Sequence, residues 1–286
     1  MTRIGSTTFA WGERTFVMGI LNVTPDSFSG DGLLAAGDPL GAAVAQARRM
    51  VDEGADLLDI GGESTRPGHA DVTVAAERAR VVPVIEAVRA ALPHLAISID
   101  TTKAEVAEAA IAAGADAIND VWGTGPGGAD LAAVAASHGV PLLVMHNRAQ
   151  PVYRDVVAEV IADLRAAVER AIGLGVAADG VIVDPGIGFG KTADQNVAIL
   201  RDLGAFRSLG RPILLGTSRK STLGRILDLP PDERLEATLA TTALGVAAGV
   251  DLVRVHDVQA NVRTARVADA IVRGTWRAEQ PQGGLR

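Results

Sequence analysis

The sequence predicts an α/β protein built as a single (β/α)8 barrel, the TIM-barrel fold, in which eight parallel strands alternate with helices. Two observations favour this fold. Eight short runs rich in β-branched residues are separated by alanine-rich helical segments, and each run ends on or just before a polar residue. The length of 286 residues also suits one barrel. A Rossmann domain would carry Gly-x-Gly-x-x-Gly after its first strand, and that pattern is absent there.

The predicted strands and helices follow one another in regular order along the chain. Strands are expected at residues 16–23, 57–62, 96–100, 117–121, 142–146, 181–185, 212–217 and 252–257. Clear helical segments are expected at 41–53, 102–113, 156–174 and 237–250, with Thr102 and Glu105 as a capping box for the second of these. A Gly-x-Asp step precedes several strands, as in Gly54-Ala-Asp56, Gly114-Ala-Asp116 and Gly249-Val-Asp251. This step is the nearest feature to an internal repeat.

The first residues predict a small hairpin that closes the bottom of the barrel. A turn at Gly12-Glu13 would pair residues 7–11 with residues 14–17. The expected organisation is therefore a hairpin segment at 1–15, a barrel at 16–273 and a flexible C-terminal tail at 274–286.

Composition limits the classes of function. The chain contains no cysteine, which excludes disulfides and thiol nucleophiles and fits a cytoplasmic protein. Residues 1–12 contain no apolar export segment, and the longest uncharged run, 237–250, is too short to span a bilayer and predicts a buried helix. A net charge of -7 argues against nucleic acid or a membrane as the main partner. Any anion site must therefore be a local cluster of cations.

Polar side chains at the strand ends are the candidates for function, because the carboxyl ends of barrel strands meet at one face. They are Asn22, Asp59, Asp100, Asn119, His146, Asp184, Ser218 and His256. Asp100 favours function, because Thr102 already supplies the helix cap after it. Asn119 is either a site residue or half of a satisfied pair with Asp120 in the barrel wall. Asp59 lies deeper in its strand and is interpreted as a structural hydrogen-bond partner, and His146 as ordinary barrel packing.

The stretch from Asp184 to Thr192 resembles two phosphate-binding motifs without matching either. It ends like a Walker A loop, but Pro185 stands where the first glycine belongs. Its Gly-x-Gly-x-Gly spacing also fails the dinucleotide pattern. The simpler interpretation is a flexible loop after the sixth strand that places Phe189 over the barrel mouth.

Cations gather after strands seven and eight, where barrels commonly bind phosphate. Period two places Arg254 and His256 on the same side of their strand, and Lys220 can approach from the neighbouring loop. Arg254 lies in an apolar strand and looks uncompensated, which a merely solvated basic loop would not explain. An anion site is therefore predicted, next to carboxylates that match the paired N–H donors of a planar heterocycle.

Several motifs together resemble the dihydropteroate synthases, the pterin-binding enzymes of folate biosynthesis. They are the segments 16–29, 54–68, 184–191, 216–221 and 254–256, and the resemblance covers roughly residues 16–273. It implies a transferase that joins 6-hydroxymethyl-7,8-dihydropterin diphosphate to p-aminobenzoate and releases pyrophosphate and 7,8-dihydropteroate. It also implies a homodimer.

The resemblance implies a role for each matching residue. Asn22 would hold the Mg²⁺ that accompanies the diphosphate, and Arg254 with His256 would hold the diphosphate itself. The pterin would be bound by Asp100, Asn119, Asp184 and Lys220. The p-aminobenzoate pocket would be lined by Thr65, Phe189 and Ser221, with Arg66 on the second loop.

The first loop departs from the family pattern. Relatives usually continue Asp-Gly-Gly after the Asp-Ser-Phe-Ser stretch, whereas this chain reads Gly30-Asp31-Gly32. The flanking glycines could re-aim Asp31 towards the site, where it would stabilise a cationic intermediate, or Asp31 could be a solvated turn residue.

Two alternative functions stay open at this point. One is a methyltetrahydrofolate-binding corrinoid methyltransferase barrel, which needs no diphosphate site. The other is a pterin-binding paralogue that has lost catalysis.

Overall fold

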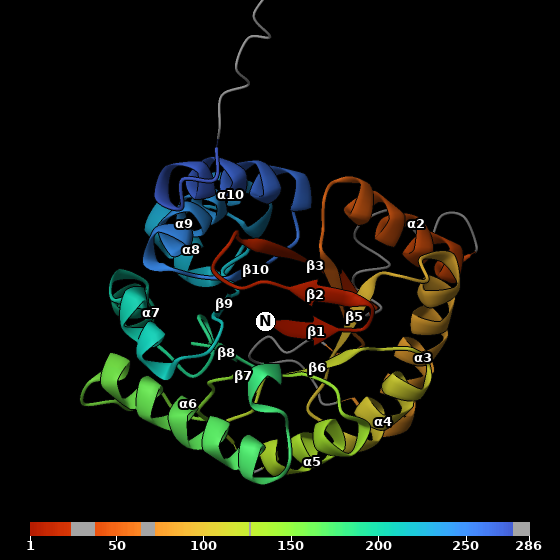
Figure 1. Ribbon diagram of the computed structural model, residues 1–286. Helices are drawn as coiled ribbons and strands as arrows, with labels where there is room; N and C mark the ends of the chain where they lie inside the picture. The colour runs from red at the N-terminus through yellow and green to blue at the C-terminus, as the bar shows by residue number, and fades with distance from the viewer. Residues whose placement is uncertain (24–37, 64–71, 126, 277–286) are drawn as a thin grey trace, which may run out of the picture.

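One parallel sheet, closed into a barrel and ringed by helices, forms the core of the molecule (Figure 1). The computed structural model describes residues 1–23, 38–63, 72–125 and 127–276. The strand order is β8-β7-β6-β5-β4-β3-β10-β9. The two outer strands meet through a parallel bridge between Val183 and Ile213 and a 2.9 Å bond from Val183 N to Pro212 O. The predicted (β/α)8 fold is confirmed.

The elements alternate as the sequence indicated. The barrel strands are β3 (Phe16–Asn22), β4 (Leu57–Gly61), β5 (Ala96–Asp100), β6 (Ala117–Asp120), β7 (Leu142–Met145), β8 (Val181–Asp184), β9 (Leu214–Leu215) and β10 (Leu252–Val255). The helices are α2 (Pro39–Asp52), α3 (Val74–Ala91), α4 (Ala104–Ala112), α5 (Gly128–His138), α6 (Val156–Gly173), α7 (Ala193–Arg201), α8 (Ser221–Leu227), α9 (Leu235–Ala248) and α10 (Val258–Val272). Short 3-10 turns lie at Ala178–Gly180, Leu203–Leu209 and Pro231–Glu233.

The N-terminal hairpin exists, but the predicted pairing of residues 7–11 with 14–17 is wrong. Instead β1 (Thr2–Ile4) pairs antiparallel with β2 (Thr7–Phe9) around Gly5, whose φ of 60° suits a tight turn. Gly12 is not a hairpin turn, because Phe16 and Val17 after it pair with β10 of the barrel, and its N–H donates to the Asp251 carboxylate at 3.1 Å. The chain after it joins the barrel. The hairpin still crosses the barrel bottom, in the middle of the ring in Figure 1.

The barrel interior is layered from apolar to polar along the strands. Its bottom layer packs against Ile4 and Phe9 of the hairpin and consists of Phe16, Met18, Leu57, Ala96, Ala117, Leu143, Ile182, Leu214 and Leu252. Side chains two positions further along a strand point to the same side. Those positions hold Asp59, Ser98, Asn119, Asp184 and Arg254. Strand period therefore places the polar groups inside the barrel, above an apolar plug.

The recurring Gly-x-Asp step has a structural reason. The glycines 54, 114 and 249 have φ values of 102°, 114° and 94°, a left-handed conformation that ends each helix. The aspartate two residues later accepts a hydrogen bond from a backbone N–H at the start of, or just before, the neighbouring strand. The three bonds are Val17 N to Asp56 at 2.8 Å, Ile97 N to Asp116 at 3.0 Å and Ile213 N to Asp251 at 3.0 Å. Each step thus ends a helix and ties two strands together.

Two helix predictions need correction. The capping box at Thr102 is wrong: α4 begins at Ala104, after Lys103, which makes no side-chain cap bond. Thr101 turns the chain instead, because its hydroxyl accepts from Lys103 N at 3.2 Å and donates to Glu77 at 2.7 Å. The uncharged run predicted as a buried helix is α9, but it is buried on one face only, since Leu244 is 68% exposed.

No described helix is both long enough and apolar enough to cross a bilayer.

Candidate active site

A network of buried charges fills the upper barrel. Asp59 Oδ2 accepts from Arg254 Nε at 2.5 Å and from Asn119 Nδ2 at 2.9 Å, while its Oδ1 accepts from Ser98 at 2.6 Å. Arg254 Nη2 donates to Asp100 Oδ2 at 2.6 Å. The prediction that Arg254 is uncompensated is wrong, because two carboxylates share its guanidinium. Asp59 is a hydrogen-bond partner as predicted, and it is also the centre of the network.

Asp100, at the end of β5, retains an unused acceptor. It is 6% exposed, and its buried Oδ1 has no hydrogen-bond partner among the described residues. Burial raises the pKa of Asp100 to about 7, and the Asp59 charge adds to the shift while Arg254 opposes it. Buried carboxylate oxygens are normally satisfied. Thr102 does not cap α4, so it gives no reason to assign Asp100 a function, but the buried oxygen without a partner makes Asp100 a candidate ligand contact.

Asp184 and Lys220 form a second pair of charged groups. Asp184 ends β8, and its Oδ1 accepts from Gly186 N at 2.7 Å. Burial raises the pKa of Asp184, and the nearby Lys220 acts against that shift. Burial lowers the pKa of Lys220 to about 8, and Asp184 opposes it. The Lys220 amine donates to Ile187 O and lies 4.3 Å from the centre of the Phe189 ring. Phe189 therefore lies against the site, as the sequence predicted.

The segment after β9 is fixed to the end of β10. Arg219, with a φ of 57°, forms a double contact with Asp257 at 3.0 and 2.6 Å. Ser218 Oγ lies 2.9 Å from His256 Nδ1 and accepts from His256 N at 3.1 Å. Lys220 follows these residues and immediately precedes α8. The structure brings Lys220, Arg254 and Asp100 into one electrostatic group, whereas the described contacts hold His256 to Ser218.

The other predicted site residues fall at the rim or outside the described residues. Asn22 ends β3 and is half-buried, and Ser221 begins α8 and is exposed. Asp31, Thr65 and Arg66 lie outside the described residues.

The fit to Mg²⁺ depends on the donors present. Within the described ranges, no group of three His, Asp or Glu side chains could hold a metal ion. Mg²⁺ commonly takes one or two protein ligands and completes its shell with water and substrate phosphates. One amide oxygen from Asn22 therefore suits an ion that arrives with a diphosphate.

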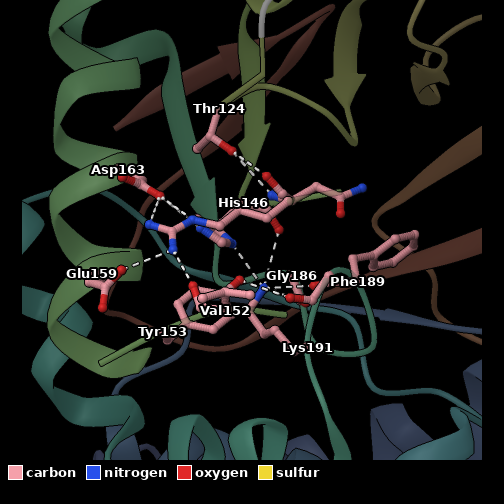
Figure 2. Close-up of polar contacts among 12 residues, drawn as sticks. Thr124, His146, Val152, Tyr153, Glu159, Asp163, Gly186, Phe189 and Lys191 are labelled. Carbon is pink, nitrogen blue, oxygen red and sulfur yellow. Dashed lines mark hydrogen bonds and ion pairs between the residues drawn. The ribbon is translucent and has the colours of Figure 1, made fainter. Parts of the chain in front are cut away.

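Sequence reasoning missed a polar cluster beside the site. The interpretation of His146 as ordinary packing is wrong: its Nε2 lies 3.1 Å from Asp163 Oδ2 and its Nδ1 lies 2.9 Å from Lys191 Nζ (Figure 2). Lys191 lies 45 residues away in the glycine-rich loop. No local pattern signals this contact, because helix α6 and two strand ends must first come together.

Comparison with known proteins adds a direct line of evidence. The family model described as "Pterin binding enzyme" matches residues 18–256. The dihydropteroate synthase of Clostridium beijerinckii is 48% identical over 272 residues, which is 95% of this chain and 99% of that relative. The chain belongs to the dihydropteroate synthase family.

Solved dihydropteroate synthases share the fold of this family member. The structure from Clostridium difficile has a TM-score of 0.87 and 46% identity, covering 93% of this chain and all of that one. The structure from Xanthomonas albilineans has a TM-score of 0.84 and 44% identity, covering 90% of this chain and 93% of that one. The barrel described here is thus the dihydropteroate synthase barrel, and the charged network lies within the matched range.

Proposed function

We propose that this chain condenses 6-hydroxymethyl-7,8-dihydropterin diphosphate with p-aminobenzoate, as a dihydropteroate synthase of folate biosynthesis. The observation that carries this proposal is the buried Asp100, which has a spare acceptor in the barrel mouth and lies in one charged group with Asp184 and Lys220. The relatives support it, since the Clostridium difficile structure was solved with pteroic acid and the Xanthomonas albilineans structure with 4-aminobenzoic acid.

The pterin would occupy the centre of the barrel mouth. The Asp100 and Asp184 carboxylates accept hydrogen bonds from the N–H groups of the ring, and charge-assisted bonds of this kind are stronger than neutral ones. Lys220 donates to the ring, and Asn119 helps to hold the edge of the pocket. The buried negative charges also stabilise the pterin-methyl cation that remains when the diphosphate leaves. The chain therefore needs no protein nucleophile.

The diphosphate would lie beside Arg254 and His256. Arg254 uses Nε and Nη2 on the two carboxylates, and no described residue accepts from its Nη1. Its remaining N–H donors suit phosphate oxygens. Asn22 would supply one oxygen ligand to Mg²⁺, which neutralises charge on the leaving group. Together these groups lower the energy of the charge that builds up as the bond to the diphosphate breaks.

The p-aminobenzoate would lie above the pterin, against Phe189 and Ser221. In this proposal Thr65 and Arg66, which lie outside the described residues, complete the pocket. Holding the aniline nitrogen against the pterin methyl carbon lowers the barrier by roughly 7–11 kcal/mol, the range for well-oriented reactants.

Asp31 also lies outside the described residues. We propose that it helps to stabilise the cationic intermediate despite its one-residue shift from the family pattern. Asp31→Ala should then lower kcat at least tenfold, about 1.4 kcal/mol of transition-state stabilisation, with pterin affinity almost unchanged. A kcat within twofold of wild type would remove Asp31 from the mechanism.

We further propose that the protein is a homodimer. Three large apolar side chains on the packed helices α9 and α10 are exposed to solvent: Leu244 by 68%, Val267 by 62% and Ile271 by 78%. Large apolar side chains that are exposed on two packed helices are the candidates for contact with another chain. A second copy of the chain would cover it.

One assay separates the synthase from both alternatives. We expect pyrophosphate release that requires the pterin diphosphate, p-aminobenzoate and Mg²⁺ together. The corrinoid methyltransferase would instead consume methyltetrahydrofolate, and the non-catalytic paralogue would bind pterin without releasing pyrophosphate. No release by a folded wild-type protein would overturn the proposal.

A further inference from the structure

A half-buried lysine outside the proposed substrate contacts holds the loop between β8 and α7. Lys191 Nζ lies 2.9 Å from His146 Nδ1, 3.0 Å from Gly186 O and 3.0 Å from Phe189 O (Figure 2). A lysine ammonium carries three protons, which these three acceptors can take, and His146 O lies at 3.4 Å as a fourth, more distant acceptor. Burial lowers the pKa of Lys191 to about 7, while Asp184 opposes the shift. The amine is thus committed to the protein rather than to a substrate.

The other side of His146 fixes which of its nitrogens accepts the bond. His146 is fully buried, and its Nε2 lies 3.1 Å from Asp163 Oδ2 on α6. Arg148 also holds this carboxylate oxygen, through Nε at 3.0 Å and Nη2 at 2.8 Å. An ionised carboxylate can only accept, so Nε2 carries the proton and Nδ1 offers its lone pair to Lys191. Burial lowers the pKa of His146 to about 4, and the Lys191 charge adds to the shift, so the ring stays neutral.

The loop held by Lys191 has an unusual backbone. Gly186, Gly188 and Gly190 have φ values of 71°, 84° and 56°, and residues other than glycine rarely adopt such values. A Cβ atom at Gly186 would lie 1.9 Å from His146 O, and one at Gly190 would lie 2.2 Å from Arg148 O. The loops after β7 and β8 are therefore in direct backbone contact. The prediction of a loose, flexible loop does not describe this packing.

A second bond ties the same two loops. Tyr153 Oη donates to Gly190 O at 2.9 Å, one residue before Lys191. Arg148 lies 4.4 Å from the centre of the Tyr153 ring, so the group that orients Asp163 also packs against the tyrosine. The chain from Arg148 through Asp163 and His146 to Lys191 is continuous in space.

This loop delivers three groups to the active site. Gly186 N donates to Asp184 at 2.7 Å, Ile187 O accepts from Lys220, and the Phe189 ring lies 4.3 Å from the Lys220 amine. Lys191 binds the carbonyls of residues 186 and 189, which bracket these contacts. Movement of the loop would displace Phe189 first, because Asp184 is also held within β8.

We propose that Lys191 is a positioning residue that, through neutral His146, sets the conformation of the loop carrying Phe189 and thereby the affinity for p-aminobenzoate. This inference rests on the proposed function for the identity of the second substrate. The shape of the loop itself does not depend on it. Lys191 acts here through Phe189 and touches neither substrate.

Lys191→Met tests the inference, because methionine keeps most of the side-chain length and removes every donor. We expect amide hydrogen exchange within residues 186–190 to rise at least tenfold. The KM for p-aminobenzoate should rise at least tenfold, with kcat and the Kd for pterin within threefold of wild type. Arg201→Met serves as a control for charge loss, since its ion pair with Asp202 is exposed, and it should leave all four quantities unchanged.

Tyr153→Phe keeps the test decisive if Lys191→Met does not fold. It removes only the bond to Gly190 O. We expect amide exchange in the loop and the KM for p-aminobenzoate to rise by about threefold. Unchanged exchange in a folded variant would overturn the inference. Raised exchange with an unchanged KM for p-aminobenzoate, or equal losses for both substrates, would also overturn it. Absence of activity in the wild-type protein would instead overturn the proposed function, and the exchange measurement would still report on the loop.

Discussion

At the scale of single residues, the three carboxylates inside the barrel have different charged neighbours. Asp59 and Asp100 share one guanidinium, and Asp184 faces an amine. A buried carboxylate is stable only when it is paired or hydrogen-bonded. Asp100 is only partly satisfied, since one of its oxygens has no described partner. This oxygen of Asp100 can still accept a hydrogen bond from a ligand.

Asp184→Asn tests the pterin contact at this scale. The amide oxygen can still accept from Gly186 N–H, so the fold should be retained, but the charge that strengthens the bonds to the pterin is lost. We expect pterin binding, measured by calorimetry, to weaken by about 1.5–3 kcal/mol. Equal pterin affinity in the variant and wild type would contradict the assignment.

The pH dependence of kcat/KM for the pterin diphosphate follows from two groups. Asp100, with a pKa of about 7, must be ionised to accept a ring N–H, so the rate should rise as pH increases through 7. Lys220, with a pKa of about 8, must be charged to act as an ammonium donor, so the rate should fall as pH increases through 8. The result is a narrow bell-shaped profile for the free enzyme. Asp100→Asn should flatten the acidic limb, and an unchanged limb would assign it to another group.

At the scale of elements, the site depends on loops whose ends are fixed by neighbouring helices. The residue after Lys191, Thr192, caps helix α7 through a capping box: Thr192 Oγ1 accepts from Gln195 N at 3.3 Å, and Gln195 Oε1 accepts from Thr192 N at 2.8 Å. Both bonds satisfy N–H groups that a helix start leaves open. The cap therefore also anchors the end of the β8 loop.

Thr192→Ala should reduce the free energy of unfolding by about 1 kcal/mol, the typical cost of losing an N-cap side chain. Urea denaturation measures this difference. Thr264→Ala is a suitable control, because that hydroxyl donates only to Ala260 O within α10, and a change below about 0.5 kcal/mol is expected. Equal losses for the two variants would show that the cap has no special role.

At the scale of the whole molecule, the candidate active site lies at the carboxyl ends of the strands, and exposed apolar side chains lie on α9 and α10. The hairpin closes the bottom, so ligands must enter from the carboxyl ends of the strands. On the outside, α9 and α10 expose the apolar side chains that the proposed homodimer would cover. The loop after β9 that carries Lys220 leads into α8, and α9 follows α8 in the chain.

Ile271→Glu tests this surface. Wild type should have the mass of a dimer by light scattering at micromolar concentration, and the variant should shift to a monomer because an ionised side chain would be buried without a partner. Val152→Glu, at a position 70% exposed outside α9 and α10, should remain a dimer. A monomeric wild type would refute the homodimer, and a dimeric Ile271→Glu would refute this face.

The sequence by itself determined the barrel and most of the polar residues at its mouth. Strand ends are local properties, so the polar residues at the ends of the apolar runs were enough to place Asp100 and Asp184 at the barrel mouth, and strand period was enough to place Arg254 on the same side as His256. The family motifs added proposed roles to these positions. The glycines that end helices before the Asp steps were also visible, because a left-handed residue is a local requirement.

Only the tertiary structure decided which groups pair. Arg254 meets Asp59 and Asp100 across 195 and 154 residues of chain, and Lys191 meets His146 across 45. Closure of the barrel brings these partners together, and nothing in the neighbouring sequence specifies them. The segment predicted to pair with residues 7–11 likewise has a distant partner instead, since Phe16 and Val17 pair with Leu252 and Val253 of β10. Local sequence determines conformation and the direction of side chains, whereas charge compensation depends on contacts that only the folded chain creates.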